Sequence, residues 1–279
     1  MDNFEILEEK EMKIKRRRLT STALILSLVL SLFVPAMAMA SEDTLKPLPK
    51  VGDVISGFKA TALDHIDMID SDTVTFEHEK TGAQLLYIQN NDINRSFEIT
   101  FKTPAFDDTG VNHVLEHASV SGSERYPFKN LLFTILNQTY CSFVNAFTAI
   151  NLTSYPVSSM SEAQLLKLSE VYLDCVFNPY IYQDENIFKR EAWRYELESE
   201  EAPLTITGTV FSEMKGSLSS IETASYYNVM DTLFPDSVIS KNSGGDPDFI
   251  PELTYEHVLD THDAYYHPSN CLIVLYGDL

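Results

Sequence analysis

The sequence has few cysteines, and their spacing suits neither a disulfide framework nor a thiolate metal site. Its 279 residues include only Cys141, Cys175 and Cys271, which are widely spaced and form no C-x-x-C pair. Small disulfide-rich domains and cysteine-ligated zinc sites need more cysteines at closer spacing. Cys141 and Cys175 stand among apolar neighbours, so we expect them to be small buried residues. Any zinc in this protein should therefore be held by nitrogen and oxygen ligands.

Basic residues are also scarce. The chain has 20 Lys and Arg against 41 Asp and Glu, and beyond Ala40 the count is 14 against 36, because the first forty positions hold six basic and five acidic residues. A surface with this charge repels nucleic acids and anionic lipids, which argues against a nucleic-acid partner. The charge is typical of solubility outside a cell, and attraction of basic peptides is a second interpretation. A hydrophobic content of 44% excludes wholesale disorder.

A long apolar run occurs near the N-terminus, at residues 23–34. A basic block at residues 13–18 precedes this run, and Pro35 and a small-residue series ending in Ala38-Met39-Ala40 follow it. This three-part layout predicts a secretory signal peptide over residues 1–40. The protein is therefore expected to be secreted or to lie in the cell envelope.

An uncleaved membrane anchor is the alternative to a cleaved signal peptide. The twelve residues of the run fall short of the ~20 that a spanning helix needs, although counting on to Ala40 nearly reaches that length. Pro35 and the A-x-A pattern favour cleavage, after which we expect no stable membrane span. Residues 1–11 are acidic, which is atypical of a signal peptide, so Met12 is a second candidate for the start of the protein.

Hydrophobic periodicity predicts the elements of the remaining chain. Strands are expected at residues 73–78, 83–88, 96–101, 141–148, 152–158 and 270–276, the second and the first forming a hairpin around Gly82. Helices are expected at residues 109–122, 131–137, 162–177, 184–197, 208–222 and 254–265, with N-cap candidates at Asp107, Asp108, Thr109 and Ser161. Strands followed by helices and then by returning strands predict one α+β domain over residues 41–279, in which an antiparallel or mixed β-sheet packs with helices.

The segment His113-Val114-Leu115-Glu116-His117 lies in the helix expected after Thr109. Positions i and i+4 share one helix face, so both histidines can direct a ring nitrogen at one ion, with Glu116 at the border of that face. The H-x-x-E-H order is that of the inverzincin metallopeptidases. It predicts one Zn²⁺ ion with His113 and His117 as ligands, and Glu116 as the general base that activates zinc-bound water. Two unrelated surface histidines are the alternative, which the apolar Val114 and Leu115 disfavour.

A third zinc ligand must come from elsewhere in the chain. The downstream candidates are Glu170, Glu191, Glu196 and Glu213. Glu213 has apolar neighbours, which suggests a helix face turned inward, where an unpaired carboxylate is costly. Coordination of a metal would offset that cost, and an ion pair with Lys215 is the alternative.

Several segments, in order along the chain, resemble the insulinase/pitrilysin family of zinc metallopeptidases. The segment from Asp107 to His117 is similar to the zinc segment of this family, and more narrowly to that of its presequence-protease branch. Further similarities lie at residues 122–127, 145–148, 213–216, 243–247 and 266–270. The resemblance covers about residues 51–279 and implies a LuxS-like metallopeptidase half-domain. At the matching positions it implies His113, His117 and Glu213 as the ligands and Glu116 as the base.

The resemblance implies further roles outside the ligand set. Asn145-Ala146-Phe147 would be an edge strand that pairs with extended substrate backbone, a form of β-augmentation. Glu191 would be an acid that supports a zinc ligand from behind, with an exposed helix charge as the alternative. Trp193 and Tyr195 are expected to pack in the core. Residues 149–152 depart from the family's usual charged stretch at that point, which leaves the subsite preference open.

The resemblance implies a zinc-dependent metalloendopeptidase that acts on unstructured peptides, and the predicted signal peptide implies that it is exported. Members of this branch are several times longer, and their far half supplies Arg and Tyr groups that bind the substrate. The chain stops at Leu279 directly after an expected strand, so we expect a domain cut off at its C-terminal end, completed by a missing C-terminal half or a partner chain. A truncated, non-catalytic peptide- or partner-binding domain is the alternative, and a purely structural zinc site is a third interpretation.

Overall fold

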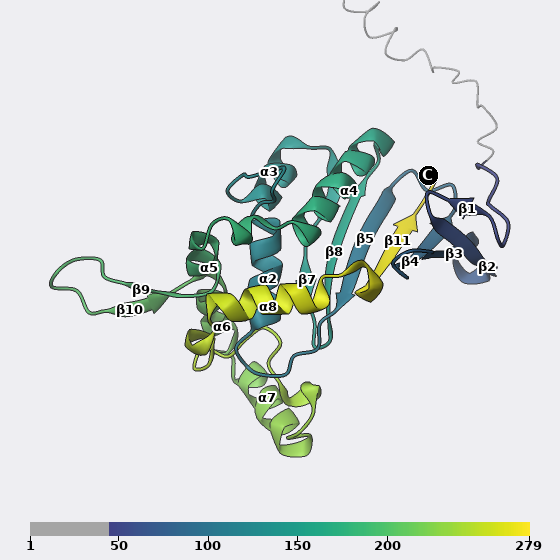
Figure 1. The fold of residues 1–279 in the computed structure, drawn as a ribbon. Helices are drawn as coiled ribbons and strands as arrows, with labels where there is room; N and C mark the ends of the chain where they lie inside the picture. The colour runs from purple at the N-terminus through teal and green to yellow at the C-terminus, as the bar shows by residue number, and fades with distance from the viewer. Residues whose placement is uncertain (1–44) are drawn as a thin grey trace, which may run out of the picture. The chain divides into compact units, whose positions relative to one another are not determined.

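The computed structural model describes residues 45–279 (Figure 1). The predicted signal peptide at residues 1–40 and the second candidate start, Met12, lie outside the described residues. Within residues 45–279, no helix combines the length and the apolar character that crossing a membrane requires.

A nine-stranded mixed sheet organises the fold, which confirms the predicted α+β class (Figure 1). The strands are β1 (Val54–Ile55), β2 (Phe58–Ile66), β3 (Ser71–His78), β4 (Gln84–Gln89), β5 (Arg95–Lys102), β6 (Cys141–Val144), β7 (Phe147–Thr148), β8 (Leu152–Ser159) and β11 (Cys271–Tyr276). Their order is β1-β2-β3-β4-β11-β5-β8-β6, and β7 also pairs with β8. The predicted hairpin around Gly82 is present as the antiparallel pair β3–β4.

The last strand, β11, lies in the interior of the sheet. It pairs in parallel with β4, so that Ile273 lies opposite Leu85, and antiparallel with β5, so that Ile273 also lies opposite Ile99. The prediction of a buried strand was only partly right, because Cys271 is buried but Leu272 is 41% exposed. Neighbouring β5 alternates between buried and half-buried residues, with one face in the core and the other partly exposed. Strands of this sheet therefore need apolar residues on one face only.

The helices of the described residues pack against the sheet and against one another. They are α2 (Val111–Val120), α3 (Leu131–Gln138), α4 (Glu162–Phe177), α5 (Asn186–Glu191), α6 (Thr209–Ser217), α7 (Ile221–Leu233) and α8 (Tyr255–Tyr265). α2 is the central helix: Val114, Leu115 and Ala118 are fully buried, and its neighbours include α4, α5, α6, α8, β7 and β8. The predicted cap of α4 is confirmed, since the Ser161 hydroxyl accepts a hydrogen bond from the Gln164 amide.

Two predicted helices were too long. The helix expected over 184–197 ends at Glu191, and a hairpin of β9 (Arg194–Glu196) and β10 (Thr205–Thr207) follows and projects from the domain (Figure 1). The helix expected over 208–222 is divided into α6 and α7, because the Ser220 hydroxyl accepts from the Thr223 amide and so caps a new helix.

The residues after α5 explain its early end. The Trp193 indole N–H donates to the Leu253 carbonyl at 2.9 Å, and a Cβ built on Gly208 would lie 2.0 Å from the Ala192 carbonyl oxygen. These tertiary contacts hold the chain in an extended turn. Trp193 packs against the core as predicted, but the core position predicted for Tyr195 was wrong, since Tyr195 is 63% exposed on the hairpin.

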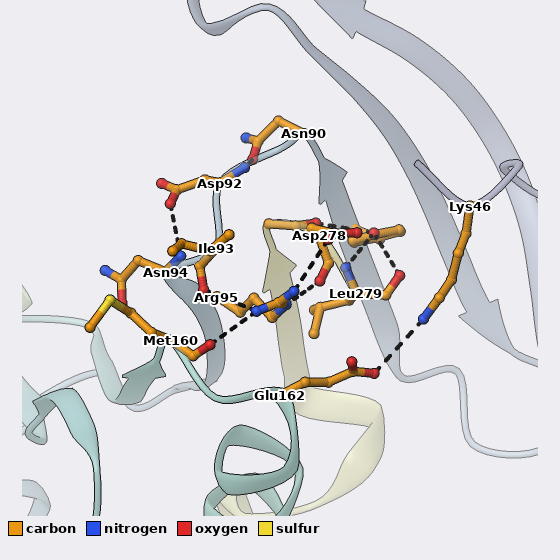
Figure 2. A network of polar contacts seen from close by, with 12 residues as sticks. Lys46, Asn90, Asp92, Ile93, Asn94, Arg95, Met160, Glu162, Asp278 and Leu279 are labelled. Carbon is orange, nitrogen blue, oxygen red and sulfur yellow. Dashed lines mark hydrogen bonds and ion pairs between the residues drawn. The ribbon is translucent and has the colours of Figure 1, made fainter. Parts of the chain in front are cut away.

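Arg95 anchors the segment that follows β11 (Figure 2). Its side chain is 12% exposed, and its guanidinium donates to both the backbone carbonyl and the carboxylate of Asp278. The remaining donor, Nη1, reaches the carbonyl oxygens of Ile93 and Met160, each at 3.1 Å. One side chain therefore joins the beginning of β5, the end of β8 and the chain after β11.

We expect Arg95→Met to lower the free energy of unfolding by about 2 kcal/mol, because it leaves the Asp278 carboxylate and three carbonyl groups without this donor. Arg125→Met is the matched control, since the Arg125–Glu170 pair is well exposed, at 60% and 40%, and should contribute less than about 1 kcal/mol. Urea unfolding followed by circular dichroism measures both changes. Equal effects of the two variants would contradict the anchoring role of Arg95.

Candidate metal centre

The two histidines of the H-x-x-E-H segment lie side by side on α2. Their ring centroids are 4.9 Å apart, and the side chains of His113 and His117 are 11% and 25% exposed. This is the placement expected from the i, i+4 spacing on one helix face.

Glu213, on α6, completes a group of three with these histidines. Its Oε2 atom lies 3.8 Å from His113 Nε2 and 3.7 Å from His117 Nε2, and one ligand atom from each of the three residues lies within 4.8 Å of the others. No further group of this kind occurs among residues 45–279. Of the four glutamates considered from the sequence, Glu213 is therefore the one that can share an ion with both histidines.

The donor set fits zinc. Two imidazoles and a carboxylate are the ligand types of catalytic zinc, and in a tetrahedral site with bonds of about 2.1 Å the ligand atoms are roughly 3.4 Å apart. The distances of 3.7 and 3.8 Å to Glu213 require only a slight contraction to meet this geometry. The Glu213 side chain is 54% exposed, so the group opens toward solvent and leaves room for a fourth ligand.

The expectation that Glu213 lies on an inward helix face was wrong. Val210, Phe211 and Met214 occupy the buried face of α6, and Glu213 lies on its flank, directed at the histidines. Lys215 makes no ion pair with Glu213 in the described part of the chain, and its ammonium lies over the Phe211 ring at 5.9 Å. The cost of burying a carboxylate is therefore no reason to assign Glu213 as a metal ligand. Its position beside the two histidines is the reason.

The other candidate carboxylates do not join this group of three. Glu170 pairs with Arg125 and Lys167, and Glu196 pairs with Arg194. Glu191 is 7% exposed, so the alternative of an exposed helix charge is wrong. Its Oε2 lies 3.4 Å from His117 Nδ1, at the outer limit of a hydrogen bond, while His117 Nε2 faces Glu213.

His113, like His117, has an acceptor at its Nδ1 atom, and a loop provides it. Its Nδ1 lies 2.9 Å from the Gly244 carbonyl, which accepts the ring proton and leaves Nε2 for an ion. Asp108 holds this loop in place by accepting from the Asn242 amide at 2.8 Å and the Lys241 ammonium at 3.2 Å. The sequence did not predict the contact with the Gly244 carbonyl. Every residue has a backbone carbonyl, so the residue type does not indicate which one contacts a distant histidine.

The N-cap expected for α2 was also wrong. The Asp107 carboxylate accepts from the backbone and hydroxyl of Thr109, and the cap position is Gly110, with a φ of 68° and no side-chain cap. A Cβ at Gly110 would lie 2.6 Å from the Gly245 Cα. This close approach of two glycines brings the 242–245 loop to the start of α2, beside His113.

Glu116 lies beside the three candidate ligands but outside their group. It is 7% exposed, and its Oε2 accepts a hydrogen bond of 2.6 Å from the Thr148 hydroxyl. Burial raises the pKa of Glu116 above its ordinary value, although the Thr148 hydroxyl and the two histidines oppose the rise. A buried carboxyl with a raised pKa next to an open metal position can take and return a proton.

The charges around His117 and Glu191 favour an ion pair between them. Burial lowers the pKa of His117, but contact with Glu191 and the carboxylates of Glu116 and Glu213 raises it by more, so its pKa lies above the ordinary value. Burial alone would raise the pKa of Glu191, but His117 and Arg190 lower it to about 2. Glu191 therefore stays ionised behind His117.

The predicted substrate segment lies at the edge of the sheet beside this group. The strand expected over 141–148 is divided into β6 and β7, and Asn145 and Ala146 lie between them, with the Asn145 amide 3.3 Å from the Pro156 carbonyl of β8. β6 is the last strand in the sheet order, and Phe147 is 46% exposed. A cavity of about 420 Å³ is lined by residues 145–148 together with His113, Glu116, His117 and Glu213.

Thr148 is a second residue that the sequence reasoning missed. It directly follows the Asn145-Ala146-Phe147 segment on β7 and carries the hydroxyl that contacts Glu116. Its position directly after the predicted substrate strand was the one feature of the sequence that indicated a place in the site.

Comparisons with known proteins find relatives of similar sequence. The family model "Insulinase (Peptidase family M16)" matches residues 105–215. Protein HypA of Clostridium perfringens is 42% identical over 229 residues, which are 82% of this chain and 24% of HypA. The mitochondrial presequence protease of Drosophila melanogaster is 39% identical over 230 residues, which are 81% of this chain and 22% of that protein.

Solved structures show the same fold at low sequence identity. The structure of pitrilysin matches with a TM-score of 0.61 and 18% identity, over 81% of this chain and 23% of pitrilysin. A protease from Helicobacter pylori matches with a TM-score of 0.60 and 19% identity, over 75% of this chain and 46% of that protease. The chain thus spans about a quarter of the length of the curated relatives that it matches.

Proposed function

Because this chain belongs to the insulinase family, peptidase family M16, we propose that it is the zinc-binding domain of an exported metalloendopeptidase that hydrolyses unstructured peptides. The observation that carries the proposal is the convergence of His113, His117 and Glu213 on one open point, with the buried carboxylate of Glu116 beside it. A structural zinc site has four protein ligands and no open position, so the three-residue group favours catalysis.

The proposed roles of the residues follow from their contacts. Zinc at such a site supplies Lewis acidity, which lowers the pKa of a water molecule and polarises the scissile carbonyl. Glu116 takes the proton of the attacking water on its carboxylate and delivers it to the leaving amine. The Thr148 hydroxyl, 2.6 Å from Oε2, holds that carboxylate in the cavity.

We propose that the peptide binds as an added strand along Asn145-Ala146-Phe147. The position of β6 at the end of the sheet order supports this proposal, since an edge strand can pair its backbone groups with an extended peptide. Phe147 and Phe143 stack on each other with their ring centroids 6.3 Å apart, and both are partly exposed, which gives this edge an apolar surface for substrate side chains.

Two parts of the proposal concern the whole protein. The matched region is only 24% of HypA and 22% of the Drosophila protease, so the proposed partner of this domain is the additional segment that the relatives carry, or a chain that supplies its equivalent. The A-x-A pattern at Ala38-Met39-Ala40 supports export through a signal peptide.

Metal analysis and a cleavage assay test the function together. The purified chain should contain about one zinc per molecule and should cleave an unstructured peptide, as seen by mass spectrometry of the products. A chelator should stop the cleavage, and added zinc should restore it. Zinc uptake without any cleavage would favour the alternative, a peptide- or partner-binding domain, and a chain that takes up no zinc would refute the metal site itself.

A further inference from the structure

Arg190 and Glu191 are neighbours at the end of α5, and their side chains contact each other behind the candidate metal group. Arg190 Nε donates to Glu191 Oε1 at 2.7 Å, and the Glu191 side chain is 7% exposed while that of Arg190 is 33% exposed. Arg190 has no contact with His113, His117 or Glu213 among the interactions of the described residues. Glu191 is therefore the contact through which Arg190 can influence the position of a metal-binding histidine.

The two oxygens of Glu191 have different partners. Oε1 accepts from Arg190 Nε and from the Ser121 hydroxyl, which is 3.1 Å away, whereas Oε2 faces His117 Nδ1 at 3.4 Å. The Ser121 hydroxyl is also 2.9 Å from the His117 carbonyl, and its single proton serves both acceptors. Arg190 is thus the donor that is committed to Oε1 alone.

The guanidinium of Arg190 forms an incomplete pair with this carboxylate. Arginine commonly binds a carboxylate through two parallel N–H groups, one for each oxygen. Here Nη2 of Arg190 is buried and has no hydrogen-bond partner among the described residues, and the second carboxylate oxygen is turned to His117 instead. A buried donor without a partner costs free energy, so this arrangement does not maximise the strength of the arginine pair. It divides the carboxylate between an arginine and a histidine.

We propose that Arg190 is a positioning residue for metal binding: it fixes Glu191 Oε1, so that Oε2 stays at His117 Nδ1 and His117 Nε2 stays directed at Glu213 and the ion. The inference rests on the proposed function, since it requires zinc at this group. Carboxylates that orient a metal-binding histidine affect metal affinity about 10- to 100-fold. Arg190 acts one contact further out, so the lower end of that range, about tenfold, applies to it.

The test compares zinc dissociation constants, measured by competition with a chromophoric chelator on the full chain. Arg190→Met should weaken zinc binding about tenfold. Arg194→Met is the matched control, because Arg194 lies four residues away, pairs with the partly exposed Glu196 and does not contact Glu191, so its zinc affinity should equal that of the wild type. In a Glu191→Gln background, Arg190→Met should cause no further loss, since the arginine would have no carboxylate to position.

A second variant separates position from charge. Arg190→Lys keeps the positive charge but lacks the Nε–H donor, so it should lose affinity as well, and the visible spectrum of the cobalt-substituted protein should differ from that of the wild type and of Arg194→Met. Thermal unfolding of the metal-free variants shows whether each one is folded, and Arg190→Lys remains available if Arg190→Met is not.

Different results identify which proposal fails. Unchanged zinc affinity in Arg190→Met or Arg190→Lys would overturn the positioning role while leaving the proposed function intact. A tenfold loss that persists in the Glu191→Gln background would also overturn it, because Arg190 would then act by another route. A wild-type chain without measurable zinc affinity would overturn the proposed function, and this inference with it.

Discussion

Replacement of Glu116 by glutamine is expected to lower the rate of peptide hydrolysis by about 10²- to 10⁴-fold, the usual contribution of a general base. Glutamine has nearly the same shape and still accepts a hydrogen bond from Thr148, which lies 2.6 Å from the carboxylate. It has no basic oxygen that can take a proton from water. The fold and the cavity should therefore persist while the proton transfer is lost.

Zinc content separates this outcome from a damaged site. Glu116 does not belong to the group formed by His113, His117 and Glu213, so the Glu116→Gln chain should still contain about one zinc. Glu170→Gln is the matched control, an identical chemical change at an exposed ion pair on α4, and should leave the rate unchanged. Hydrolysis by Glu116→Gln at the wild-type rate would mean that another group moves the proton.

The second large effect concerns the ligands. Glu213→Ala and His113→Ala should each weaken zinc binding by about 10²- to 10³-fold, because structural zinc sites with four protein ligands bind with about 10–16 kcal/mol, or roughly 3 kcal/mol for each ligand. Both variants should also lose hydrolysis. Glu213 is more than half exposed, so its replacement should change stability little in the absence of metal.

Chelator competition measures these affinities, and two other glutamates serve as controls. Glu170 and Glu196 have the same carboxylate group as Glu213, but each is paired with a basic side chain away from the histidines. Glu170→Ala and Glu196→Ala should keep wild-type zinc affinity. A loss of zinc in either of them, with Glu213→Ala unaffected, would show that the third ligand is assigned to the wrong residue.

The histidine pair could be predicted from the sequence because its geometry is local. Four residues separate His113 from His117, and any α-helix places them on one face. Glu213 is on another helix, α6, so helix geometry could not select it among four glutamates, and its selection depended on its apolar neighbours and on the family resemblance. The physical reason given for Glu213, burial on an apolar face, was wrong, since the apolar neighbours in the sequence lie on a different side of α6.

Helix boundaries could also be predicted where neighbouring residues determine them, and not where contacts with distant residues do. α4 begins where predicted because the Ser161 cap is encoded within one turn, and it also ends at the predicted residue. α5 ends before the predicted position because Trp193 and Gly208 make contacts with distant backbone. The cap of α2 at Gly110 also depends on a distant segment, the loop around Gly245, which no periodicity within the helix reveals.

The interior position of β11 determines when this domain can be completed during synthesis. Residues 271–276 fill the gap between β4 and β5, so a ribosome must deliver nearly the whole domain before those two strands gain their shared neighbour. Closing contacts over such sequence separations is slow, and open strand edges can pair with other chains in the meantime. α2 packs against this sheet and against α8, which precedes β11 by a few residues, so the H-x-x-E-H helix gains these neighbours only after residues 255–276 have been synthesised. Metal capture is therefore expected to follow the arrival of the last strand rather than the synthesis of the histidines.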